Sequence, residues 1–170
     1  MIVTERLILR ETEKEDLADI VRWRNDWDNL CNMYSYLPLS LCKEEKWYDN
    51  YINDDTKLML IIVERENNEK IGTVSLSGID YKNQKAELGI LIGDKKHKGR
   101  GFGTEAVNLL TEFAFNEMNL HKVYLRVFED NIAAINLYTK AGFTKDGVLK
   151  HDYFTGGKFV NIIIMSKLRE

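Results

Sequence analysis

Short segments in which apolar and polar positions alternate, or in which β-branched residues predominate, recur along the chain. A period of two residues is typical of a strand with a buried face. The pattern predicts strands at residues 3–10, 57–64, 70–77, 85–92, 122–128, 143–150 and 159–167. Two of the intervening segments, Glu66-Asn67-Asn68-Glu69 and Gly156-Gly157, have the composition of hairpin turns.

Four other segments have apolar residues at the helical spacing i, i+3, i+4 and i+7. The first follows Thr12-x-x-Glu15, a capping-box signature, and runs to about residue 26. The second follows Ser40, the third contains the apolar positions from Ala106 onward, and the fourth covers residues 132–140. The order of strands and helices predicts a mixed α/β fold with helices packed on one sheet.

Composition limits the class of protein. The 44% of hydrophobic residues is enough for one core, so we expect a single domain over residues 1–170. Cys31 and Cys42 fit neither a disulfide framework nor a zinc site, which favours a reducing compartment. The first residues carry charges and no apolar run reaches membrane-spanning length, so we expect a cytoplasmic protein with no membrane partner.

The charge of the chain is small but unevenly distributed. A net charge of −3 argues against a nucleic-acid partner. Residues 1–55 carry 13 acidic and 7 basic side chains, whereas the remaining residues carry 14 acidic and 17 basic ones. The first part therefore suits a cation and the second an anion, although acidic helix surfaces facing water would give the same pattern. Candidate attractors for a cation are Glu11, Glu15, Asp26, Asp28 and Asp54.

Three alternating glycines mark the most informative segment, Lys98-Gly99-Arg100-Gly101-Phe102-Gly103-Thr104, between a predicted strand and a predicted helix. Glycine permits positive φ and close approach of the backbone to a ligand, and a helix start offers unpaired N–H groups and the positive end of the helix dipole. The segment therefore predicts a phosphate-binding loop.

The glycines alone do not decide which phosphate compound binds. A Walker loop is excluded because no Gly-x-x-x-x-Gly-Lys-Ser/Thr occurs. Gly101-x-Gly103-x-x-Ala106 matches a dinucleotide fingerprint, and Glu129-Asp130 follow the next strand at a suitable distance. However, about a hundred residues precede the loop and only one further helix follows the next strand, which is unlike a dinucleotide-binding domain.

The residues around the loop favour a third interpretation. After the loop come a helix, a strand and the pattern Asn131-x-x-Ala134-x-x-x-Tyr138-x-x-x-Gly142-Phe143. With the preceding strand Ala86–Ile92, this order resembles the GNAT superfamily of N-acetyltransferases over nearly the whole chain. The family signature Gln/Arg-x-x-Gly-x-Gly/Ala falls on Lys98-x-x-Gly101-x-Gly103, with lysine as its first residue. Thr4–Arg10 further resembles the ribosomal-protein-alanine and spermidine acetyltransferase branch.

This resemblance implies a mostly antiparallel sheet of about seven strands, flanked by four helices, in which two parallel central strands splay apart. It also implies acetyl-CoA as co-substrate, with its pyrophosphate on backbone N–H groups of the glycine loop and its pantetheine arm between the splayed strands. Lysine and arginine side chains around the loop would add positive potential. The implied cofactor contacts are Leu91, Ile92, Lys98, Gly99, Arg100, Gly101, Phe102, Gly103, Thr104 and Asn131.

Acyl transfer to an amine needs a group that accepts the amine proton and a group that protonates the leaving thiolate. By resemblance, Tyr138 is the acid, and Glu87 is the candidate base, acting directly or through a water. A core tyrosine and a surface glutamate are the alternatives for these two residues. Asn131 can cap the following helix under any interpretation. A backbone N–H near Leu91 is the expected oxyanion donor.

The leading hypothesis is an acetyl-CoA-dependent N-acetyltransferase that acts by direct attack of a primary amine in a ternary complex. The acceptor would be a small molecule or a peptide: a protein N-terminus, a polyamine or an amino sugar on a nucleotide carrier. The alternatives are a non-catalytic acyl-CoA sensor of the same fold and a dinucleotide-binding protein. The three histidines lack ligand spacing, so no metal is expected. The resemblance adds a homodimer as an expectation.

Overall fold

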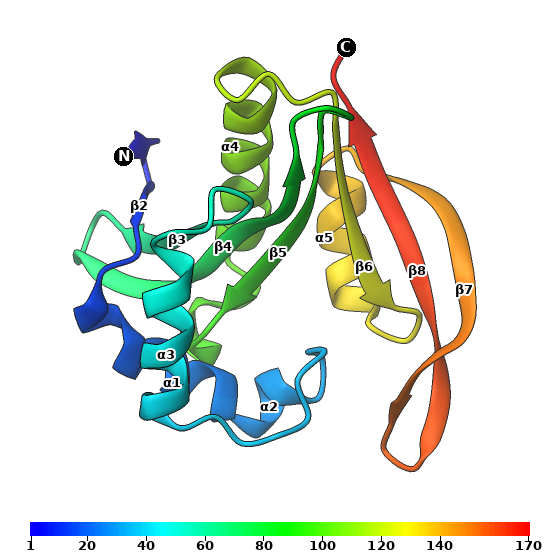
Figure 1. Cartoon of the computed structure of the whole chain (residues 1–170), viewed down its shortest axis with the longest axis horizontal. Helices are drawn as coiled ribbons and strands as arrows, with labels where there is room; N and C mark the ends of the chain where they lie inside the picture. Colours follow the sequence, from blue (N-terminus) through cyan, green and yellow to red (C-terminus); the bar gives the residue numbers. More distant parts are fainter.

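One eight-stranded sheet organises the computed structural model, which describes residues 1–170 (Figure 1). Its spatial order is β1-β2-β3-β4-β5-β6-β8-β7, and every neighbouring pair is antiparallel except β5 with β6. The strands are β1 (Ile2–Val3), β2 (Leu7–Glu11), β3 (Leu58–Glu64), β4 (Glu69–Asp80), β5 (Lys85–Ile92), β6 (Lys122–Phe128), β7 (Thr144–Thr155) and β8 (Lys158–Leu168).

Helices cover both faces of this sheet. They are η1 (Lys14–Asp16), α1 (Leu17–Asn25), α2 (Trp27–Leu30), α3 (Leu41–Tyr51), η2 (Lys95–His97), α4 (Phe102–Asn116) and α5 (Ile132–Lys140). In β3, Leu60 and Ile62 belong to the main core with α4, whereas Ile61 and Val63 pack with α1 on the opposite face. This burial on both sides explains why β3 is a continuous apolar run rather than an alternating one.

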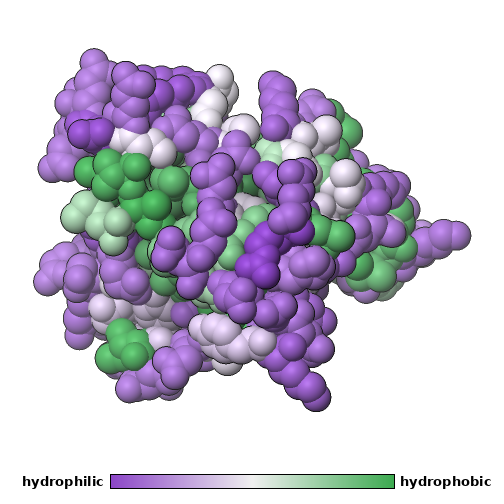
Figure 2. All heavy atoms as spheres, turned by 90° about the horizontal axis from the view of Figure 1, so that it is seen from above, coloured by the Kyte–Doolittle hydropathy of each residue, from purple (hydrophilic) through white to green (hydrophobic).

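The predicted α/β class and the mostly antiparallel sheet are confirmed. Every predicted strand is present, and β1 adds an eighth. The four predicted helices are also present, while α2 and the two short 3₁₀ turns were not predicted. None of the helices is long and apolar enough to cross a membrane. Polar side chains cover most of the face in Figure 2, where apolar atoms form smaller separate patches.

The predicted capping box is displaced by one residue. Glu13 is the N-cap, its N–H donates to Asp16 Oδ2, and the Asp16 N–H donates to the Glu13 carbonyl, so these two residues stand in place of Thr12 and Glu15. The Thr12 hydroxyl instead donates to the Met59 carbonyl across the neighbouring strand, at 2.8 Å. A long-range hydrogen bond therefore outcompetes the local cap that the sequence pattern favours.

The two parallel strands separate soon after they pair. β5 and β6 are in register only at Lys85 with Lys122, Ala86 with Val123 and Glu87 with Tyr124. Beyond Glu87, β5 keeps its antiparallel partner β4 but has no neighbour on the other side, so its last residues face an opening (Figure 1). The predicted splay of two central parallel strands is confirmed.

A buried carboxylate joins three elements at one edge of the sheet. Asp16 accepts hydrogen bonds from Arg10 Nη1 (2.7 Å) and Nη2 (2.8 Å), from the Glu13 N–H (2.9 Å) and from Lys70 Nζ (3.2 Å). Burial alone would raise the pKa of Asp16, but the hydrogen bonds from Arg10, Glu13 and Lys70 outweigh it and hold this pKa below its ordinary value. The carboxylate thereby fixes β2, η1 and β4 relative to one another.

Asp16→Asn should lower the free energy of unfolding by about 3 kcal/mol, because it leaves Arg10 and Lys70 without their shared anionic partner. In the wild type this stabilisation is complete above the unfolded pKa of about 4, and it is lost as pH falls through the lower folded value. Urea unfolding at pH 7 and pH 3 measures both effects. Equal stability of variant and wild type at pH 7 would contradict the assignment.

Candidate active site

The splayed strands enclose a cavity of about 490 Å³. Its walls come from the ends of β5 and β6, the glycine loop, α5 and the segment that contains α2 and the residues after it. Most of the cofactor residues expected from the sequence meet here: Leu91, Ile92, Lys98, Gly99, Gly101, Gly103, Thr104 and Asn131. Tyr138 lines the same cavity.

The glycine loop ends in an uncapped helix. Gly101 is the N-cap of α4 with φ of +84°, in the left-handed region that favours glycine, and no side chain caps the helix. The first intrahelical bond runs from the Glu105 N–H to the Gly101 carbonyl. The N–H groups of Phe102, Gly103 and Thr104 therefore have no partner within the helix, which makes this terminus suited to an anion.

Gly103 has a different role from Gly101. A Cβ atom there would lie 2.7 Å from Leu137 Cδ1 of α5. Glycine thus allows α5 to approach the start of α4 closely, so that both helices border the cavity.

The basic side chains of the loop already have partners. Lys98 Nζ donates to Asn29 Oδ1 at 2.6 Å, and Asn29 in turn donates to the carbonyls of Trp23 and Gly93. The other pairs are Lys95 with Asp28, Lys96 with Glu69, and Arg100 with Glu64. Backbone N–H groups and the helix end, rather than free lysines, are therefore the groups available to hold a phosphate.

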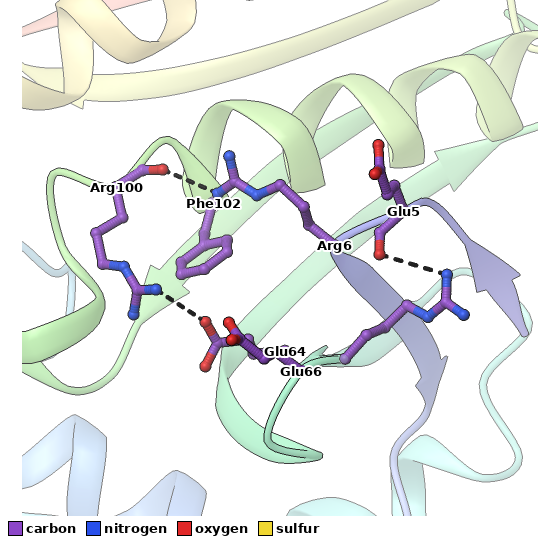
Figure 3. A pocket seen from close by; sticks show the side chains of 7 residues that line it. Glu5, Arg6, Glu64, Glu66, Arg100 and Phe102 are labelled. Atoms are coloured by element: carbon purple, nitrogen blue, oxygen red, sulfur yellow. Dashed lines mark hydrogen bonds and ion pairs between the residues drawn. The ribbon is translucent and has the colours of Figure 1, made fainter.

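Two of the expected cofactor residues turn their side chains away from the cavity. Arg100 and Phe102 line a separate pocket on another side of the loop, together with Arg6 and Glu64 (Figure 3). Phe102 is also only 3% exposed. Any contact of these two residues with a cofactor in the main cavity would have to use their backbone atoms.

The end of β5 offers a free backbone edge. Leu91 and Ile92 pair with Thr73 and Gly72 of β4, and no strand pairs with them on the other side. An extended chain with amide groups could bond to this edge as an added strand does. The pantetheine arm of coenzyme A has that chemistry.

Tyr138 is held on α5 with its ring largely buried. Asn131 caps the helix by accepting a hydrogen bond from the Ala134 N–H at 3.2 Å, which confirms the predicted cap. Burial raises the pKa of Tyr138 to about 12, so its phenol is protonated at neutral pH. The residue can therefore donate a hydrogen bond to a group in the cavity.

Glu87 is placed differently from Tyr138. Its carboxylate accepts hydrogen bonds from Arg126 Nε (2.8 Å) and Nη2 (3.4 Å) on the neighbouring strand. Glu87 itself does not line the cavity, but Arg126 does. The ion pair raises the pKa of Arg126, so this side chain is a permanent cation. The sequence did not predict Arg126: the register pairs Glu87 with Tyr124, and Arg126, two residues further along β6, bonds to the Glu87 carboxylate.

Three aromatic rings stand next to this ion pair. Tyr34 lies 5.0 Å from Phe128 and 5.2 Å from Tyr153, measured between ring centroids, and Phe128 lies 5.2 Å from Tyr153. The Arg126 guanidinium is 5.1 Å from the Tyr34 centroid. We call these three residues the aromatic wall. Trp23, by contrast, belongs to the core.

Only one of the acidic residues proposed as cation attractors reaches the cavity, namely Asp28, and it is paired with Lys95.

A cluster of two carboxylates and a histidine was not expected from the sequence. Glu64, Glu69 and His97 come together from β3, β4 and η2. Both carboxylates have a basic partner, in Arg100 and Lys96, so a metal ion would have to displace these side chains.

Comparison with known proteins supports the acyltransferase interpretation. The family model described as an acetyltransferase (GNAT) domain matches residues 6–144. Spermidine N(1)-acetyltransferase of Escherichia coli K12 is 33% identical over 161 residues, which cover 92% of this chain and 83% of the relative. The corresponding protein of Vibrio cholerae is 29% identical over 94% of this chain and 91% of its own length.

Solved structures agree with the sequence relatives. The crystal structure of spermidine N-acetyltransferase from Vibrio cholerae in complex with CoA and spermine has a TM-score of 0.91 and 29% identity. The match covers 97% of this chain and 96% of the other. These matches leave the dinucleotide-binding alternative without support. Acetyl-CoA is therefore the co-substrate, the chain is an N-acetyltransferase, and it belongs to the acetyltransferase (GNAT) domain family.

Proposed function

We propose that this enzyme transfers the acetyl group of acetyl-CoA to a primary amine of a polyamine such as spermidine, by direct attack in a ternary complex. The observation that carries the proposal is a single cavity lined by the glycine loop, by Tyr138 and by two residues of the aromatic wall, Tyr34 and Phe128. The relatives that act on spermidine match nearly the whole chain, and one of them was crystallised with both CoA and spermine.

The two ends of the cavity suit the two substrates. The uncapped start of α4 can hold the pyrophosphate, and the free edge of Leu91 and Ile92 can pair with the pantetheine amides. Elsewhere in the cavity, Tyr34 and Phe128 of the aromatic wall offer apolar surface for methylene groups and ring faces that attract an ammonium group, and Tyr153 packs against both rings. A chain of methylenes between amines has both features.

The chemical step needs a neutral amine, a stabilised oxyanion and a protonated thiolate. In our proposal Tyr138 protonates or hydrogen-bonds the departing sulfur, and a backbone N–H near Leu91 receives the oxyanion. Because Glu87 does not line the cavity, it takes the amine proton through a water, and its hydrogen bonds with Arg126 set how available its carboxylate is. No acyl-enzyme is required, because the amine attacks the thioester itself.

A dodecameric structure of the Vibrio cholerae spermidine N-acetyltransferase has a TM-score of 0.85 and 30% identity to this chain. The proposal therefore includes a homo-oligomer, of which a homodimer is the smallest form. The unpaired edge strand β7 and the exposed Phe154 and Phe159 on the β7–β8 hairpin support it.

Release of free thiol from acetyl-CoA, measured with a panel of amines, tests the acceptor. We expect spermidine and spermine to give kcat/KM at least tenfold above a peptide with a free N-terminus and a nucleotide-linked amino sugar. A higher kcat/KM for either of the latter would replace the polyamine with that acceptor class. Binding of acetyl-CoA without transfer to any amine would instead support the sensor hypothesis.

Tyr138→Phe should lower kcat by about 10–100-fold and leave KM for acetyl-CoA within about twofold, because the ring stays and only the proton donor is lost. Since the pKa of Tyr138 is raised to about 12, its phenol stays protonated through pH 10. An alkaline fall in kcat that begins near pH 8 and disappears in Tyr138→Phe would contradict this. Unchanged kcat in the variant would remove the assigned acid.

Glu87→Gln should lower kcat/KM for the amine by about 100-fold at pH 7, if its carboxylate removes the amine proton. The deficit should shrink toward pH 10, where more of the amine is already neutral. Glu129→Gln is the matched control, because Glu129 directly follows β6 and bonds to Asn161 rather than to Arg126. This variant should leave kcat/KM for the amine nearly unchanged. A deficit of equal size at both pH values would assign Glu87 a structural role with Arg126.

A further inference from the structure

The N-terminal residues Thr4 and Arg6 lie beside the glycine loop, about a hundred positions away in the sequence. Arg6 Nη2 donates to the Arg100 carbonyl at 2.9 Å, and Arg6 Nε lies 3.4 Å from Glu105 Oε2. The Thr4 hydroxyl donates to the other oxygen of Glu105 at 2.5 Å. Both oxygens of Glu105 therefore have partners from the segment that precedes β2.

The position of the Arg100 carbonyl matters for the loop. It lies between Gly99 and Gly101, whose φ angles are +75° and +84°. Glycine residues have more conformations open to them than other residues, so such a loop loses its shape unless another group fixes it. A charge-assisted hydrogen bond from Arg6 to the carbonyl between them is such a constraint.

The position of Glu105 creates an electrostatic problem. An acidic side chain in the first turn stabilises α4, because it meets the positive end of the helix dipole. A pyrophosphate at the same terminus would be repelled by that carboxylate. Arg6 compensates its charge and Thr4 donates a hydrogen bond to its other oxygen, so that the helix end can serve an anionic ligand.

Packing holds the Arg6 side chain in place. Its guanidinium carbon is 4.4 Å from the centroid of the Phe102 ring, and that of Arg100 is 4.8 Å from the same centroid. Figure 3 shows the two arginines flanking Phe102, with Arg100 bonded to Glu64. Phe102 is the first residue of α4, so Arg6 contacts the loop, the start of the helix and its first-turn acid together.

We propose that Arg6 is a positioning residue for acetyl-CoA: it fixes the Arg100 carbonyl and compensates the charge of Glu105, so that the N–H groups at the start of α4 can donate hydrogen bonds to the pyrophosphate. This inference rests on the cofactor site of the proposed function and not on the identity of the acceptor. Arg6 itself lines the pocket on the other side of the loop and does not line the main cavity.

Titration of the full-length protein with coenzyme A, without any amine, tests the inference independently of the acceptor. Arg6→Ala should raise the dissociation constant about tenfold, while kcat at saturating acetyl-CoA stays within about twofold. Arg6→Lys keeps the positive charge but lacks the several N–H donors of the guanidinium, so it should give a dissociation constant between those of the wild type and Arg6→Ala. Arg65→Ala is the matched control, because Arg65 lines the same pocket but bonds only to the Thr4 and Glu5 carbonyls.

The double variant Arg6→Ala/Glu105→Gln separates positioning from general destabilisation. Removing the uncompensated carboxylate should recover part of the lost affinity, about threefold, whereas a loss caused by local unfolding would not be recovered. The inference is overturned if Arg6→Ala and Arg65→Ala weaken binding equally, if neither weakens it, or if the double variant binds no better than Arg6→Ala. Should Arg6→Ala not fold, Arg6→Lys with and without Glu105→Gln decides by the same comparison.

Discussion

The site depends on the short length over which β5 and β6 are paired. Three residue pairs, from Lys85–Lys122 to Glu87–Tyr124, hold the parallel register, and then each strand continues with its other neighbour alone. The antiparallel pairs on either side are long, so the sheet stays intact while its centre opens. If this edge were buried, its backbone N–H and C=O groups would lack hydrogen-bond partners, which would destabilise the fold. Here it lies open to a cavity, where an extended ligand can take the place of the missing strand.

Charge compensation governs the rest of the site. The lysines and the arginine of the glycine loop are paired with Asp28, Glu69, Asn29 and Glu64, so the loop has a fixed shape before any ligand arrives. A flexible lysine would attract an anion at longer range, but it would lose conformational entropy on binding. Backbone N–H groups that are already held in place lose less conformational entropy when a ligand binds. Lys98, whose partner Asn29 is neutral, and the positive end of the helix dipole attract an anion on approach, and the fixed amides bind it on contact.

Local signals in the sequence predicted the parts of the site that local structure builds. Glycines with positive φ, the Asn131 cap and the strand before the loop each depend on a few neighbouring residues, and each lies where the pattern indicated. The pairs that tune the site join residues far apart in the chain, such as Lys98 with Asn29 and Glu87 with Arg126. No spacing rule connects such residues. The position of the capping box was mispredicted for the same reason, because the hydroxyl of Thr12 bonds to the carbonyl of Met59, which is distant in the sequence.

The proposed acceptor end shows most clearly why the sequence alone could not complete the site. Tyr34 follows α2, Phe128 ends β6 and Tyr153 belongs to β7, so the aromatic wall exists only after three segments have met. The adjoining charges nearly cancel, because Arg126 already bonds to Glu87 and its guanidinium already faces the Tyr34 ring. An incoming ammonium group would seek both of those partners. In the proposed acceptor site it would therefore compete with a resident cation, and the strength of the Arg126–Glu87 pair would set how strongly the site discriminates among amines by charge.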